Sequence, residues 1–191
     1  MANKQAHTPA KSGNKSDVHS DTKSGDKASS PDAIQLLETD HAAVKKLFKE
    51  FEKTDDKRRK QEIATTICAE LTVHATIEEE IFYPAARAAI DEGDLLDEAE
   101  VEHASAKDLI AQIEAGAPGE ELWEAKVIVL GEYIDHHVKE EEDEMFPKVK
   151  KSDIDLEALG EELQARKDVL KANPQARKPQ SSKDARPTRP N

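Results

Sequence analysis

Residues 74–84 read HATIEEEIFYP, and residues 137–147 read HVKEEEDEMFP, with His, Glu and Pro at the same spacings. Around both stretches the apolar residues recur in steps of three and four, which is typical of a helix face directed into a core. Each stretch therefore places a histidine and a glutamate on a helix face that should be buried. The arrangement occurs twice in one chain.

A second pair of stretches repeats in the same way. DHAAVKKLFKEFE at residues 40–52 aligns with EHASAKDLIAQIE at residues 102–114, almost at the offset that relates the first pair. Each half of the chain thus carries one helix pair, and two helix pairs predict a four-helix bundle. The joints at 53–56, 91–94 and 116–119 are short, which favours antiparallel neighbours.

Composition agrees with an all-α chain, because charged residues make up 36%, aromatic residues only 4%, and the Gly and Pro residues lie mostly at the ends and joints. We predict an antiparallel up-down four-helix bundle over residues 31–152 and an additional amphipathic helix over 153–170. Residues 1–30 and 171–191 are too polar to bury a core and are predicted to be disordered tails, the second of them basic.

Charge and cysteine content exclude several classes of function. The net charge is −13, and because the tails are basic the body is more acidic still, which opposes a nucleic-acid partner. No apolar segment approaches the length of a signal sequence core or a membrane span, so we expect a cytoplasmic protein without a membrane partner. Cys68 is the one cysteine, so any metal must be held by nitrogen and oxygen.

Each of the four predicted bundle helices carries a histidine on its apolar face, and two of these helices add a glutamate one turn later. The four faces are Ile34, Leu37, His41, Val44, Phe48, Phe51; Ile63, Ile67, Leu71, His74, Glu78, Ile81; Leu96, Ala99, His103, Ala106, Ile110, Ile113; and Val127, Leu130, Ile134, His137, Glu141, Met145. Burying two unpaired carboxylates costs several kcal/mol each. Since no Lys or Arg lies on these faces beside the glutamates, a cation from solution is predicted to sit between the helices.

Simpler interpretations apply to the single residues. One histidine on an apolar face is usually a hydrogen-bonded core residue, and a glutamate-rich run is usually a solvated face. We assign most of the residues Glu79, Glu80, Glu142, Asp143 and Glu144 to solvent. His136 is predicted to face solvent or a neighbouring helix, and Cys68 and Trp123 to serve packing. The full pattern of H, HxxxE, H and HxxxE is what favours a metal site.

The ligand types restrict the metal. Four imidazoles and two carboxylates without a thiolate suit iron, with manganese or zinc less favoured, and six ligands exceed a tetrahedral zinc site. Two glutamates on opposite helices can each bridge a pair of ions, as in other bundle proteins with two metals.

Four segments, ETDHAAVKKLF, HATIEEEIFYP, VEHASAKDLI and HHVKEEEDEMFP, resemble the four helices of the hemerythrin-like, or HHE cation-binding, family over roughly residues 32–150. This resemblance implies a non-haem, carboxylate-bridged centre of two iron ions that binds O2 or a related oxidant such as nitric oxide or peroxide. It implies His41, His74, His103 and His137 as terminal ligands, and Glu78 and Glu141 as bridges.

One position departs from the family's oxygen carriers, which place a further His four residues after the third-helix histidine. Here that residue is Lys107, and Lys45 stands at the equivalent place in the first half. A protonated lysine is a poor ligand, so we hypothesise two His per iron, two bridging glutamates and an open position at each ion.

Three functions remain open at this point. The first is a protein that binds or senses small oxidants or handles iron under oxidative stress. The second is an enzyme with peroxidase, catalase-like or ferroxidase activity at the same centre. The third is a helical interaction module that retains no metal.

Overall fold

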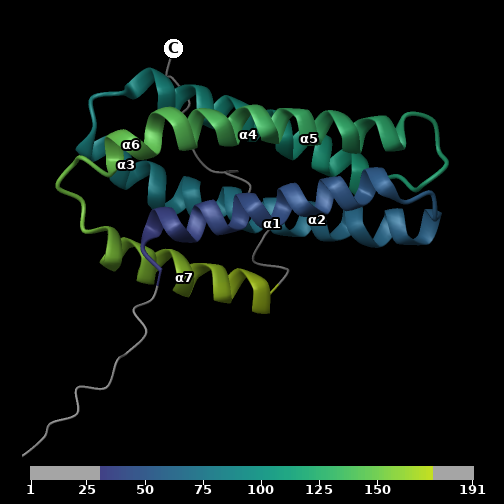
Figure 1. The fold of residues 1–191 in the computed structure, drawn as a ribbon, viewed down its shortest axis with the longest axis horizontal. Coiled ribbons are helices and arrows are strands. Elements are labelled where there is room, and N and C mark those ends of the chain that lie inside the picture. The colour runs from purple at the N-terminus through teal and green to yellow at the C-terminus, as the bar shows by residue number, and fades with distance from the viewer. Residues whose placement is uncertain (1–30, 174–191) are drawn as a thin grey trace, which may run out of the picture.

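The structure is a computed structural model that describes residues 31–173. The predicted N-terminal tail, residues 1–30, lies outside this range, as does the predicted C-terminal tail except for residues 171–173. Every regular element between these limits is a helix (Figure 1). In chain order these are α1 (Ala33–Lys53), α2 (Lys57–Ile77), η1 (Glu78–Phe82), α3 (Tyr83–Ala89), α4 (Gly93–Glu114), α5 (Trp123–Glu140), η2 (Glu141–Met145), α6 (Phe146–Val149) and α7 (Leu156–Ala172).

Four rods form the bundle, because η1 and α3 continue α2, and η2 and α6 continue α5. Helix α1 packs on α2, α4 packs on α5, and contacts of α2 with α4 and of α1 with α5 close the ring. The predicted all-α four-helix bundle with an extra C-terminal helix is confirmed. Helix α7 begins and ends slightly later than predicted and lies along α1, α2 and η1, on one side of the bundle (Figure 1).

Helix starts follow from aspartates at three joints. Asp32, Asp56 and Asp155 each accept a hydrogen bond from a backbone N–H of the first turn, which satisfies a donor that the helix leaves unpaired. Asp32 also forms a reciprocal capping box with Gln35. These caps fix where α1, α2 and α7 begin.

The two repeated motifs each contain a π-helical turn, which the sequence pattern did not predict. The backbone N–H of Tyr83 bonds to the carbonyl of Glu78, and that of Phe146 bonds to the carbonyl of Glu141, so each turn holds one extra residue. A proline follows each turn, where its ring would clash with the carbonyl four residues earlier in an ordinary helix. The extra residue shifts the buried face of the second helix, so the predicted burial of Ile81 is wrong. Ile81 is only half-buried, whereas Phe82 and Tyr83 after it are buried.

The apolar core is divided into two clusters by a polar layer. One cluster holds Leu37, Phe82, Tyr83, Leu96, Phe146 and the buried leucines of α7, and the other holds Phe51, Ile67, Leu71, Ile110, Trp123 and Leu130. Cys68 and Trp123 belong to the second cluster, as their predicted packing role requires. The layer between the clusters contains the six residues predicted as metal ligands.

Candidate metal centre

The six predicted ligands come together inside the bundle, each at most 6% exposed. We call His41, His74, His103 and His137 the site histidines, and Glu78 and Glu141 the inner glutamates. The histidines form two pairs, with Nε2 of His41 3.0 Å from Nε2 of His74, and Nε2 of His103 3.1 Å from Nε2 of His137. Two nitrogens bound at ~2.1 Å and at right angles on one ion lie about 3 Å apart, so each pair fits one cation.

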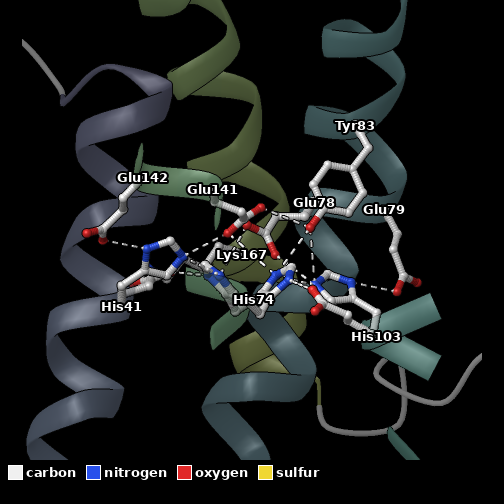
Figure 2. Close-up of polar contacts among 12 residues, drawn as sticks. His41, His74, Glu78, Glu79, Tyr83, His103, Glu141, Glu142 and Lys167 are labelled. Carbon is white, nitrogen blue, oxygen red and sulfur yellow. Dashed lines mark hydrogen bonds and ion pairs between the residues drawn. The ribbon is translucent and has the colours of Figure 1, made fainter. Parts of the chain in front are cut away.

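Each inner glutamate reaches a histidine of both pairs. Glu78 places Oε1 3.1 Å from Nε2 of His74 and Oε2 3.5 Å from Nε2 of His103. Glu141 places Oε2 3.3 Å from Nε2 of His41 and 3.5 Å from Nε2 of His137. Both carboxylates thus contact a histidine of each pair, as a shared ligand of two cations would have to. Figure 2 shows Glu78 and Glu141 beside His41, His74 and His103.

Buried oxygens in this cluster lack hydrogen-bond donors. Oε1 and Oε2 of Glu78 and Oε2 of Glu141 are fully buried without a hydrogen bond. An unsatisfied buried carboxylate oxygen carries a substantial desolvation cost, and a cation between the imidazoles and carboxylates would remove it. The chemistry of the donor set and the unsatisfied atoms therefore fit a bound metal.

A carboxylate lies beside Nδ1 of each site histidine. We call these four residues the outer carboxylates: Asp40, Glu79, Glu102 and Glu142. Their distances to Nδ1 are 2.9 Å for Glu142 to His41, 3.5 Å for Asp40 to His74, 2.9 Å for Glu79 to His103 and 2.7 Å for Glu102 to His137. A carboxylate only accepts, so Nδ1–H of His41, His103 and His137 donates to its carboxylate and Nε2 faces the interior. Asp40 approaches Nδ1 of His74 without forming a hydrogen bond.

Most of the glutamate run is exposed, as predicted, but Glu79 is half-buried, and both Glu79 and Glu142 contact a site histidine. Each follows an inner glutamate, and in the π-helical turn its side chain points sideways to a histidine of the other half of the chain (Figure 2). The remaining members, Glu80, Asp143 and Glu144, are exposed as predicted, and Glu80 pairs with Arg166 of α7.

Two lysines support the outer carboxylates. The ammonium of Lys107 lies 2.5 Å from Glu79, so this lysine neutralises the partner of His103. Lys45, at the equivalent place in the first half, instead pairs with Asp135 at 2.7 Å. Lys167 reaches in from α7 and donates to Asp40, the partner of His74. Among the helices between residues 31 and 173, α7 thus supports only the first half of the site.

Tyr83 is a site residue that the sequence analysis missed. Its hydroxyl donates to Oε1 of Glu141 at 2.9 Å and lies 3.2 Å from Nε2 of His103. The equivalent residue of the second half is Phe146, whose ring stacks on His41 with 5.9 Å between centroids. Burial and the charge of Glu141 raise the pKa of Tyr83 well above its ordinary value, so the phenol keeps its proton. The two histidine pairs therefore have chemically different neighbours.

Protons stabilise the cluster when no cation is bound. Burial opposes a charge on His74, but the carboxylates of Glu78 and Asp40 outweigh this effect and raise its pKa to about 10. At His137 burial is likewise outweighed by Glu141 and Glu102, and the pKa rises to about 9. Burial alone would raise the pKa of Glu141, yet the facing histidines hold it well below its usual range. A cation that binds through Nε2 must displace these protons.

Two spaces adjoin the histidines. A cavity of about 20 Å³ lies between the four site histidines and apolar side chains of the second core cluster, including Val44, Leu71 and Ile110. This volume has room for about one molecule of the size of water. A groove of about 460 Å³ between α1 and α5 passes Phe48 and Gly131 and reaches His41. The groove and the cavity share His41, Ile134 and Val138 in their linings, and the cavity offers a small ligand an apolar space beside the imidazoles.

The outer carboxylates and Lys167 left different signals in the sequence. Asp40 and Glu102 precede His41 and His103 at equivalent places, so the repeat itself pointed to them. Glu79 and Glu142 also repeat, but an unbroken helix would have turned them away from the histidines. Lys167 gave no signal, because it lies outside the repeat.

A four-helix bundle with histidines and carboxylates converging on a buried layer defines a class of cation-binding helical proteins. The sequence profile of the hemerythrin HHE cation-binding domain matches residues 32–149, and the chain belongs to this family. The six buried residues and their unsatisfied oxygens fit a metal-binding function.

Two related proteins match the chain. The crystal structure of a hemerythrin HHE cation-binding domain-containing protein from Mycobacterium kansasii superposes with a TM-score of 0.65 at 25% identity, covering 74% of this chain and 88% of that one. A protein of Nostoc sp. described as a DNA nickase is 33% identical over 115 residues, which are 60% of this chain and 32% of the relative. The chain thus spans about a third of the Nostoc protein. Between residues 31 and 173, no helix is long and apolar enough to cross a membrane.

Proposed function

We propose that this chain is a non-haem di-iron protein that binds O2 or a related small oxidant, nitric oxide or peroxide. The six buried residues His41, His74, Glu78, His103, His137 and Glu141 would hold the two ions. The observation that carries the proposal is the pair of inner glutamates, because each has a buried oxygen without a donor and each faces histidines of both pairs. Two cations sharing two carboxylates would satisfy this arrangement.

The donor set favours iron over the alternatives. Imidazole and carboxylate suit iron, manganese and zinc, and the lone cysteine is buried away from the site in the second core cluster. An iron pair, when bound, supplies the electrons that O2 chemistry needs. The chain's own residues orient the imidazoles through the outer carboxylates and offer an apolar cavity beside them.

Lys107 supports the hypothesis of an open position at each ion. Its ammonium is engaged by Glu79, so it does not supply the extra ligand that oxygen carriers take from this position. Tyr83 places a hydroxyl on the side of His103 and His137, with its proton donated to Glu141 in the metal-free protein. We extend no nucleic-acid function from the Nostoc relative, because the net charge of −13 opposes binding to a polyanion.

The test is the visible spectrum of protein loaded anaerobically with Fe(II), recorded before O2 is admitted, afterwards, and again once O2 is removed. An absorption that develops with O2 and reverses supports binding. Glu78→Gln, which removes one shared carboxylate, should abolish the absorption. A wild-type protein that retains no iron, or whose spectrum ignores O2, refutes the proposal.

A second candidate is an enzyme that consumes peroxide, converting two molecules of H2O2 into O2 and two of water. The buried phenol of Tyr83 favours this alternative, because a protonated donor beside an open ion suits cleavage of an O–O bond. The discriminating measurement is O2 evolution from H2O2 by iron-loaded protein. Tyr83→Phe should lower the rate by at least ~10-fold, and Tyr133→Phe, an exposed tyrosine, should leave it unchanged.

A further inference from the structure

The two halves of the bundle present different surfaces at equivalent positions. In the first half Val73 and Ile77 are buried in the core cluster that includes Leu163 of α7. The equivalent residues of the second half are His136 and Glu140, whose side chains are 64% and 29% exposed. Helix α7 covers α1 and α2 and lies on the opposite side of the bundle from α5 (Figure 1). The face of the second half is therefore open and carries metal-ligating side chains.

A second difference concerns the outer carboxylates of these two faces. Asp40 lies 3.5 Å from Nδ1 of His74 through one oxygen, and its other oxygen accepts from the half-buried ammonium of Lys167. Glu102 likewise lies 2.7 Å from Nδ1 of His137 through Oε2, but its Oε1 is 3.7 Å from Nε2 of His136. The position that a fixed positive charge occupies in the first half is occupied in the second half by an imidazole.

Geometry on this face suits a metal ion. His136 and Glu140 are one turn apart on α5, and Nε2 of His136 lies 3.1 Å from Oε1 of Glu140. One ligand atom each from Glu102, His136 and Glu140 lie within 4.8 Å of one another. One imidazole and two carboxylates, open to water for the remaining positions, form a set that divalent transition metals accept.

We propose that Glu102, His136 and Glu140 form a surface site for a divalent transition-metal ion, separate from the buried centre. The ion would neutralise the outer oxygen of Glu102 as Lys167 neutralises that of Asp40. Because Glu102 also holds His137, an ion at the surface lies one carboxylate away from the buried centre and steadies the imidazole that faces it. The site itself does not require the buried centre to hold iron.

The test uses the full chain and Co(II) alone as the probe, with bound metal counted by equilibrium dialysis. His136→Ala and Glu140→Gln should each lose about one equivalent of Co(II) per chain relative to wild type, because each removes one of three ligands. Glu161→Gln changes the charge equally on the exposed side of α7 and should bind as wild type does. The histidines of the N-terminal tail are the same in all four proteins, so their contribution cancels.

Equal Co(II) binding by wild type and both site variants overturns the proposal. A wild type that binds only the equivalent lost in His136→Ala supports the surface site and at the same time refutes the proposed buried centre. Since the side chain of His136 is mostly exposed, folding of its variant is not in question, and matching circular dichroism spectra of all four proteins verify this.

Discussion

Tyr83→Phe isolates one hydrogen bond inside the polar layer. The phenol donates to Oε1 of Glu141 at 2.9 Å in a fully buried position, and Oε2 of the same carboxylate has no donor. The substitution therefore leaves Glu141 without its hydroxyl partner. A hydrogen bond to a buried charge is worth ~1.5–3 kcal/mol, so metal-free protein should lose about that much stability. A phenyl ring fits an equivalent place in the second half, where Phe146 stacks on His41, so little of the loss should come from packing.

Thermal unfolding followed by circular dichroism in a chelating buffer measures this loss. For a domain of this size the melting temperature should fall on the order of 5–10 °C. Tyr133→Phe makes the same chemical change at a residue that is 44% exposed and should not shift the melt. With the cation bound, the penalty should shrink, because the metal then neutralises Glu141. Coincident melting curves for the two variants would show that the phenol does not support the carboxylate.

Three further changes have defined outcomes. Glu79→Gln weakens the support of His103 and should lower metal affinity ~10–100-fold in competition with a chelator, whereas Glu80→Gln, its exposed neighbour, should not. Gly160→Ala puts a Cβ 2.6 Å from the backbone carbonyl oxygen of Pro31, just before α1, and should lower the free energy of unfolding in urea by ~1–3 kcal/mol. Gly93→Ala, with no atom within 4 Å of the added Cβ, should not lower it. The charge on His74 stabilises the metal-free protein fully below the unfolded pKa of 6.5, and this contribution is lost as the pH rises to the folded pKa of about 10. The melting temperature of the metal-free protein should therefore fall between these two pH values, while its metal affinity rises. A melting temperature that does not change over this interval would contradict the raised pKa of His74.

The sequence was sufficient to predict the bundle and the six side chains that converge in it, because the same helix pair occurs twice in the chain. Each of His41, His74, His103 and His137 sits on an apolar face, and a buried face can point only toward the other helices. The π-helical turns were not accessible to this argument, because it assumes a constant angle per residue. They turn Glu79 toward His103 and leave Ile81 only partly covered.

The contact of Lys167 with Asp40 and the role of Tyr83 could not be predicted from the sequence for a different reason. The position of Lys167 beside Asp40 depends on how α7 docks, and its apolar face alone did not specify a partner surface. Tyr83 was hidden because its counterpart is a phenylalanine, so the comparison of the two halves treated both as core aromatics.

The partners of His41 and His103 show how the two halves depend on each other. His41 is approached from within by Glu141 and from outside by Glu142, and His103 by Glu78 and Glu79, so each takes its carboxylates from the opposite helix pair. A chain cut in the loop between α3 and α4 would give two fragments, neither of which has a complete set of carboxylates for its own pair of imidazoles. The centre as described therefore needs two helix pairs facing each other, whether they are joined in one polypeptide or supplied by two.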